Sequence, residues 1–149
     1  MAGMSISIDS PELAAWAARL SSGPSVSREL MRQYIVKATA TYKASIDMKV
    51  PVKTGALRST IHGRTSGLEG VVFSQSKYGM YVEKGTPPHM IMPSNKQALY
   101  WTGAQHPVRA VFHPGTKATH FFENAVYEAV PAIAVLNAEL LMKLKEAVK

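Results

Sequence analysis

The chain contains no cysteine, few acidic residues and no long apolar run: its 149 residues include 17 Lys+Arg, 10 Asp+Glu and five His. The absence of cysteine excludes a disulfide framework, thiolate metal sites and cysteine nucleophiles. The longest apolar run, Ala129 to Leu136, has eight residues and includes Pro131, whereas a membrane-spanning helix needs about 20. The N-terminal residues show no signal-peptide pattern. We therefore expect no membrane span and synthesis in the cytoplasm.

Positive charge is concentrated in one central band. Residues 28–64 contain eight Lys/Arg against Glu29 and Asp47, a balance of +6 out of the net +7 of the chain. Clustered cations raise affinity for phosphate, so this band is a candidate surface for contact with DNA. A solvated face that only aids solubility is the alternative. The candidate DNA-facing residues are Arg28, Arg32, Lys37, Lys43, Lys49, Lys53, Arg58 and Arg64.

The histidines do not form a recognisable metal site. His106, His113 and His120 recur every seven residues, but Pro107 and Pro114 prevent the continuous helix that would place them on one face. The His-Glu-x-x-His pattern is also absent from the sequence. We predict no metal and no cofactor.

Catalytic constellations are equally weak. Ser66 and Ser74 lack the Gly-flanked elbow of a nucleophilic serine, and the acids of the strand region are only Glu69 and Glu83. We predict that the chain is not an enzyme and has no catalytic residue. A hydrolase that uses histidine and Glu83 would require those side chains to meet in one pocket.

Three stretches carry the apolar spacing of amphipathic helices. They are a short stretch from Ser10 to Leu20, a long one from Val26 to Met48, and a C-terminal one from Thr119 to Val148, which Pro131 should kink or interrupt. Residues 1–24 are predicted to form an N-terminal arm with the short helix. Residues 25–149 are predicted to form a single domain.

Between the long helices, short segments rich in strand-forming residues alternate with turns. Ser59–Arg64 and Gly70–Ser76 predict a hairpin, Tyr78–Lys84 one or two helical turns ended by Gly85, and three later segments predict strands: His89–Pro93, Ala98–Thr102 and Val108–His113. Segregated helices and strands favour an α+β fold. We expect an antiparallel sheet of about four to five strands, packed by the long central helix and the long C-terminal helix.

The turns carry specific expectations. Thr54 can cap a short helical turn, Leu57 and Ile61 can pin that turn to the core, and Arg58 then projects outward. Tyr78, Tyr81 and Val82 share one helical face, which we expect to pack inward. Gly85 should adopt a positive φ, and Phe121-Phe122 should be buried where the last helix docks on the sheet.

In this order the turns resemble the neck and tail-completion family of long-tailed double-stranded-DNA bacteriophages. The resemblance spans about residues 30–145 and is carried by Pro51–Ile61, Tyr78–Thr86, His89–Ile91, Leu99–Trp101, His113–Ala118 and Phe121-Phe122. The motif residues are Pro51, Thr54, Gly55, Leu57, Arg58, Tyr78, Tyr81, Val82, Glu83, Gly85, Thr86, His113, Pro114 and Gly115. Lys53 and Lys84 depart from the family, which commonly has an acidic and an aromatic residue there.

The resemblance implies a structural virion protein, present at the head–tail junction or tail. Such proteins are subunits of a neck, tail-completion or tail-terminator ring through which DNA passes, and they have no catalytic residues. The implied partners are copies of the same chain, neighbouring head-completion and tail-tube proteins and, non-specifically, DNA. The alternative is a free-standing basic nucleic-acid-binding module.

Overall fold

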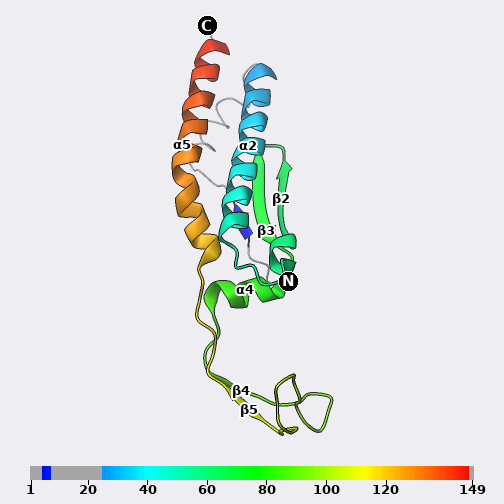
Figure 1. The fold of residues 1–149 in the computed structure, drawn as a ribbon. Coiled ribbons are helices and arrows are strands. Elements are labelled where there is room, and N and C mark those ends of the chain that lie inside the picture. Colours follow the sequence, from blue (N-terminus) through cyan, green and yellow to red (C-terminus); the bar gives the residue numbers. More distant parts are fainter. Residues whose placement is uncertain (1–4, 8–24, 148–149) are drawn as a thin grey trace.

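The computed structural model describes residues 5–7 and 25–147, which form a layered body and a projecting arm. Two long helices lie side by side, a small sheet lies against one of them, and a thin ribbon extends from the lower end of the body (Figure 1). The helices are α2 (Ser25–Lys49), α3 (Ala56–Ser59), α4 (Lys77–Lys84) and α5 (Phe121–Ala147). The strands are β1 (Ser5–Ser7), β2 (Ile61–Ser66), β3 (Glu69–Ser74), β4 (His89–Ile91) and β5 (Val111–His113).

The two long helices confirm the sequence prediction closely. Helix α2 begins one residue before Val26 and ends one residue after Met48, while α5 begins two residues after Thr119. Apolar residues at helical spacing set these bounds, because the faces of α2 and α5 that carry them pack against each other. The predicted helix near Ser10–Leu20 lies outside the described residues. Strand β1, in the predicted N-terminal arm, was not expected.

The mixed α+β class is confirmed, but the prediction of one sheet with four to five strands is wrong. The described strands form two separate sheets, an antiparallel one in the order β1-β3-β2 and a two-stranded antiparallel one made of β4 and β5. The segment Ala98–Thr102 contributes only an isolated bridge, Leu99 to Val108. The prolines at 87, 88, 93, 107 and 114 explain this, since proline cannot donate to a ladder and confines strands to short runs.

The predicted hairpin is present with a tighter loop than expected. Strands β2 and β3 pair from Ile61 opposite Ser74 to Ser66 opposite Glu69, so only Gly67 and Leu68 remain in the turn. Gly67 has a φ of 58°, and a two-residue hairpin loop favours glycine for this conformation.

Pro131 was expected to kink or interrupt helix α5, and the helix is not interrupted there. The helix continues through this residue, whose side chain is exposed. Ala129 and Ile133, on either side of it, are both buried against α2. Packing on the opposite face therefore holds the helix together where local preference alone would break it.

The core consists of two clusters along the axis of α2. The upper cluster lies between the helices and includes Met31, Tyr34, Ile35, Ala38, Ala129, Ile133, Leu140 and Leu144. The lower cluster joins α2, α3, the sheet and the start of α5, and includes Ile46, Val50, Leu57, Ile61, Val72, Phe121, Phe122 and Ala125. The predicted burial of Leu57, Ile61 and Phe121-Phe122 is confirmed.

Two tyrosines of α2 face the other helix. Burial of the ring, followed by the proximity of Tyr42, raises the pKa of Tyr34 above its usual value. Burial also raises the pKa of the Tyr42 phenol. Both phenols are therefore neutral at physiological pH, which suits their place along the helix contact.

The close approach of β3 to α2 depends on a glycine. A Cβ at Gly70 would lie 2.0 Å from Thr39 Oγ1, which itself donates a hydrogen bond to the carbonyl of Ile35 (2.7 Å). We expect Gly70→Ala to lower the free energy of unfolding by about 1–3 kcal/mol, as overpacking does. Urea denaturation measures this, and Thr39→Ala should recover part of the loss in the double variant.

The matched control is Gly63→Ala. Its Cβ would lie 3.3 Å from Thr39 Cγ2, a contact that a small side-chain shift relieves. An equal loss for Gly63→Ala and Gly70→Ala would contradict the proposed clash.

Candidate assembly surface

The arm, residues 86–118, leaves the body through a narrow neck formed by two of the motif turns. Thr86 and Thr116 exchange backbone hydrogen bonds of 2.9 and 3.0 Å. Gly85 and Gly115 flank this bridge with φ of 70° and 90°. The predicted positive φ of Gly85 is confirmed.

A side chain at either neck glycine, Gly85 or Gly115, would clash with the backbone of the facing segment. A Cβ at Gly85 would lie 2.3 Å from the carbonyl oxygen of Thr116, and a Cβ at Gly115 would lie 2.3 Å from that of Thr86. Both obstacles are backbone atoms, which cannot move aside as a flexible side chain would. The two motif turns therefore pack directly against each other, although their glycines lie 30 residues apart in the sequence.

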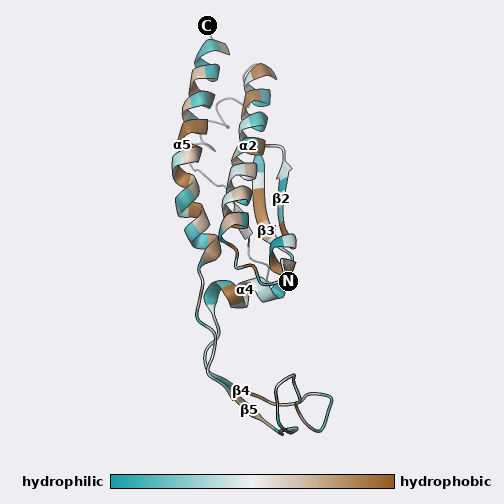
Figure 2. Cartoon of the chain, in the orientation of Figure 1, coloured by the Kyte–Doolittle hydropathy of each residue, from teal (hydrophilic) through white to brown (hydrophobic). Residues whose placement is uncertain are grey.

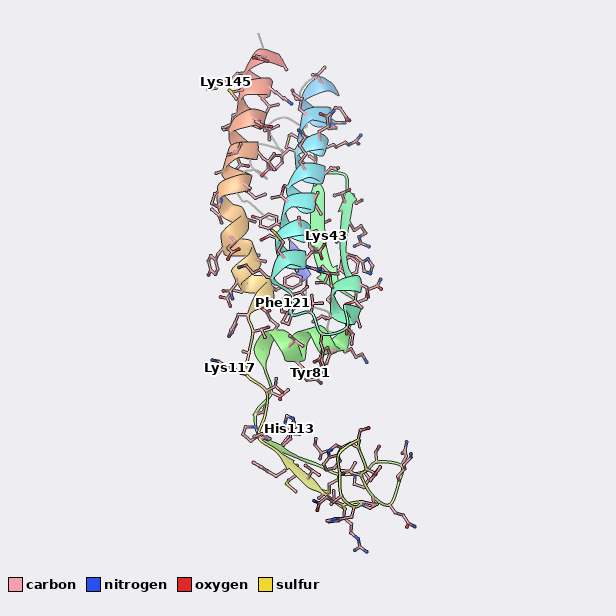
Figure 3. All side chains as sticks on the ribbon, in the orientation of Figure 1. Lys43, Tyr81, His113, Lys117, Phe121 and Lys145 are labelled. Atoms are coloured by element: carbon pink, nitrogen blue, oxygen red, sulfur yellow. The ribbon has the colours of Figure 1, made fainter. Side chains whose placement is uncertain are left out.

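Two histidines pack against each other at the start of the arm. The rings of His89 and His113 lie 5.1 Å apart between centroids, on residues paired across β4 and β5. The amide of Gly115 donates to His113 Nδ1 (3.1 Å), and His89 Nδ1 lies 2.9 Å from the carbonyl of Pro87. Figure 3 places His113 where the arm begins to extend away from the body. Both histidines thus act within the arm.

Beyond the neck, the arm has no buried side chain of its own. None of the residues from Thr86 to Ala118, all described by the structure, is buried. A two-stranded ribbon alone is only marginally stable in water. Several large apolar side chains of the arm are exposed, namely Met90, Ile91, Met92, Tyr100, Trp101 and Phe112.

Sequence reasoning placed this segment in the core sheet and so missed the arm. The available signal was proline at both ends, at Pro87-Pro88 and Pro114, around a segment with no Asp or Glu. Apolar residues predict burial but do not say against which molecule.

Helix α4 belongs to the body and leads directly into the neck of the arm at Gly85. Ser76 caps it by accepting from the amide of Tyr78 (3.2 Å), and Gly85 ends it. The prediction that Tyr78 and Tyr81 pack inward is wrong, because their side chains are 64% and 58% exposed. The inward face is formed instead by Gly79 and Glu83, while Val82 is partly buried.

Glu83 is a buried acid that joins α4 to α5. Its side chain is only 6% exposed. Its carboxylate accepts the backbone amides of Phe122 (2.9 Å) and Glu123 (3.2 Å) at the first turn of α5. The carbonyl of Glu83 also accepts from the amide of His120 (3.1 Å). An anion at the amide end of a helix satisfies orphan donors and complements the helix dipole.

The same carboxylate belongs to a group with metal-ligand chemistry. One ligand atom each from Glu83, His120 and Glu123 lies within 4.8 Å of the others. Both oxygens of Glu83 already accept amides, and His120 Nδ1 lies 3.3 Å from Glu123 Oε2. We interpret this group as the cap of α5.

The first motif turn lies on the other side of α4. Thr54 Oγ1 is 3.4 Å from the amide of Ala56, a long contact, and Gly55 begins α3 with a φ of 80°. Arg58 is exposed, as expected, but its guanidinium binds within the chain. Its Nε donates to the carbonyl of Asp47 (2.8 Å), and its Nη2 contacts the same oxygen. Arg58 therefore caps the C-terminal end of α2.

An open groove joins the first motif turn to α4. Its volume is about 530 Å³. Its lining includes Pro51, Val52, Lys53, Thr54, Gly55, Leu57, Thr60, Tyr78 and Val82. The structure thus brings the three motif segments, Pro51–Ile61, Tyr78–Thr86 and His113–Ala118, to one end of the body.

Two lysines of the predicted basic band form ion pairs within the chain. Lys43 pairs with Asp47, and Lys49 pairs with Glu128 of α5, each with 2.5 Å between nitrogen and oxygen. Lys37 lines a shallow depression beside Glu139 and Lys143 of α5. The Lys49–Glu128 pair links α2 to α5, whereas the Lys43–Asp47 pair lies within α2. The exposed members elsewhere include Arg32 at the start of α2, Lys53 beside the groove and Arg64 on β2.

Helix α5 is apolar on two faces. One face packs against α2, while the opposite face exposes large apolar side chains such as Tyr127 and Met142. Figure 2 shows both hydrophobic and hydrophilic residues along α5. We call this exposed face the outer strip; its members are Tyr127, Val130, Ala134, Val135, Ala138, Leu141 and Met142. A helix that is apolar on both sides is typically covered on both sides.

By length and composition, α5 is the one described helix that would also suit a membrane, with 22% of its most apolar stretch buried in the fold. Core helices of soluble proteins share this length and composition, so the absence of a membrane span stays a prediction.

Among the described residues, the chain combines a small layered body, an arm without a core of its own and an exposed apolar helix face. The family model described as "Bacteriophage HK97-gp10, putative tail-component" matches residues 15–85. Over that segment the chain is similar to this phage tail-component family, which supports the resemblance inferred from the turns. No curated protein and no solved structure matched.

The family match gives the chain a coarse role. A phage tail component is a structural protein of the virion and contacts other tail proteins, which agrees with that part of the sequence prediction. The matched segment includes the first two motif turns and the body elements α2 to α4. The arm and α5 follow it in the sequence.

Proposed function

We propose that this chain is a ring-forming structural subunit of the phage head–tail junction, as a neck, tail-completion or tail-terminator protein, and that it performs no chemistry. The observation that carries the proposal is the arm: 33 residues, all described, with none buried. Such a segment gains stability only by burying its apolar side chains against another protein. Repeated contacts of one kind between identical copies close into a ring when the rotation permits.

The proposal includes passage of DNA through the ring. Translocating DNA requires weak contacts with phosphate rather than base recognition. Exposed cations such as Arg32, Lys53 and Arg64 supply charge of this kind. Lys43 and Lys49 each form an ion pair with an acidic residue of the same chain. This pairing favours a ring subunit over a free nucleic-acid-binding module, which would present its cations together.

Deletion of the gene from the phage or prophage that encodes it tests the role. We expect cells to accumulate DNA-filled heads and separate tails, as seen by negative-stain electron microscopy. The intact gene supplied in trans should restore joined particles. Fully joined, infectious particles without the protein would overturn the proposal.

DNA binding and self-association of the purified protein distinguish a ring subunit from a free-standing nucleic-acid-binding module. A monomer that binds duplex DNA tightly, with strong dependence on salt, would support the free-standing binding module instead. We expect weak DNA binding and self-association into closed rings, measured by native mass spectrometry.

A further inference from the structure

We propose that the arm of one copy lies along the outer strip of α5 of the neighbouring copy. This inference rests on the proposed function and names the contact that would build the ring. Both surfaces are apolar and exposed in the single chain. Trp101 and Phe112 of the arm are 50% and 63% exposed, and Tyr127 of α5 is 67% exposed.

Within one chain the two surfaces point to opposite ends. The arm continues beyond His113, below α4, whereas α5 runs upward from Phe121 to Lys145 (Figure 3). The bridge between Thr86 and Thr116 fixes where the arm leaves the body. The arm therefore reaches an outer strip only on another copy. Contact between two different surfaces is heterologous when the two copies do not exchange it reciprocally, and such contacts close into a ring when the rotation between copies permits.

Charge favours this pairing. The arm carries Lys96, Arg109 and Lys117 and no acidic residue, while α5 carries four Glu and two Lys. The outer strip itself is uncharged; Glu128 and Glu139 lie elsewhere on α5, and Glu128 also pairs with Lys49 of α2. Two arms would repel each other, and so would two α5 helices, whereas an arm and a helix attract.

Size also agrees. From Tyr127 to Met142 the strip extends over about 22 Å at the rise of an α-helix. The extended segment from Thr86 to Pro93 covers about 23 Å at the rise of a strand. One edge of the arm can therefore follow the whole strip. Ala134 and Ala138 lie within the strip, where small side chains allow a close approach.

The absence of cysteine makes this contact directly testable. Met92→Cys places a thiol on the arm, and Ala138→Cys places one on the outer strip; both sites are exposed. Met48→Cys, at an α2 residue that is 73% exposed, is the matched control. The full-length variants are mixed in pairs and treated with a short bismaleimide. Thermal unfolding confirms that each variant is folded.

We expect the arm–helix mixture to give at least about tenfold more cross-linked dimer than the arm–control mixture, because neighbouring sites react at high effective concentration. A chain that carries both Met92→Cys and Ala138→Cys should give a ladder of multimers. Predominant arm–arm or helix–helix products, or no excess over the control, would overturn the inference.

Native mass spectrometry of the unmodified chain distinguishes a failure of the arm–helix contact from a failure of the proposed function. Rings without arm–helix cross-links would leave the proposed function intact and overturn only this contact. A chain that stays monomeric at high concentration would overturn the contact and, together with joined particles in the deletion strain, the function as well.

Discussion

Glu83→Ala is expected to lower the free energy of unfolding by about 2–4 kcal/mol. The change removes two charge-assisted hydrogen bonds and leaves the amides of Phe122 and Glu123 without their partner at the start of α5. Because Phe122 is buried, water cannot fully replace the carboxylate. Urea denaturation should show a lower midpoint with an unchanged slope, as expected when stability changes but compactness does not.

Two further variants make this result specific. Glu83→Gln keeps an acceptor oxygen but removes the charge, so we expect a loss of about 1–2 kcal/mol. Glu69→Ala removes an exposed acid of β3 and should change stability by less than about 0.5 kcal/mol. If Glu83→Ala cost no more than Glu69→Ala, the cap would contribute nothing to stability.

Gly115→Ala is expected to open the neck of the arm while the body stays folded. Alanine at a φ of 90° is strained by about 1–2 kcal/mol. Its Cβ would also meet the carbonyl of Thr86 at 2.3 Å, which adds about 1–3 kcal/mol of overpacking. The strain is relieved by breaking the bridge between Thr86 and Thr116 rather than by unfolding the helices.

Hydrogen exchange measures this opening. The amides of Thr86 and Thr116, bonded at 2.9 and 3.0 Å, should exchange at least about 30-fold faster, since a summed cost of about 2–5 kcal/mol gives a factor of ten for every ~1.4 kcal/mol. Self-association should also be lost, because the arm no longer leaves the body in a fixed direction. Amides in the middle of α2 should keep their protection.

Gly103→Ala is the matched control within the arm. Gly103 also has a positive φ, 99°, but no atom among the described neighbours lies within 4 Å of its added Cβ. This variant carries the conformational strain without the clash. Equal effects of Gly103→Ala and Gly115→Ala would show that φ alone, and not the crossing of the two turns, limits the neck.

The sequence by itself determined the elements whose stability is local. Apolar spacing predicted both long helices to within two residues, and Gly85 marked the end of α4. The hairpin around Gly67 and the burial of Leu57 and Ile61 were also predictable. Each of these depends on residues within a few positions of one another, so the pattern contains the information.

The tertiary structure alone decided the arrangement of the distant parts. Only the fold shows that the turn at Gly85 packs against the turn at Gly115, that Glu83 caps α5 and that Tyr78 faces solvent. An apolar strand has the same pattern whether it joins a core sheet or a projecting arm. Periodicity reports which side chains avoid water, but the partner that covers them is set by long-range packing within the chain and by contacts between chains.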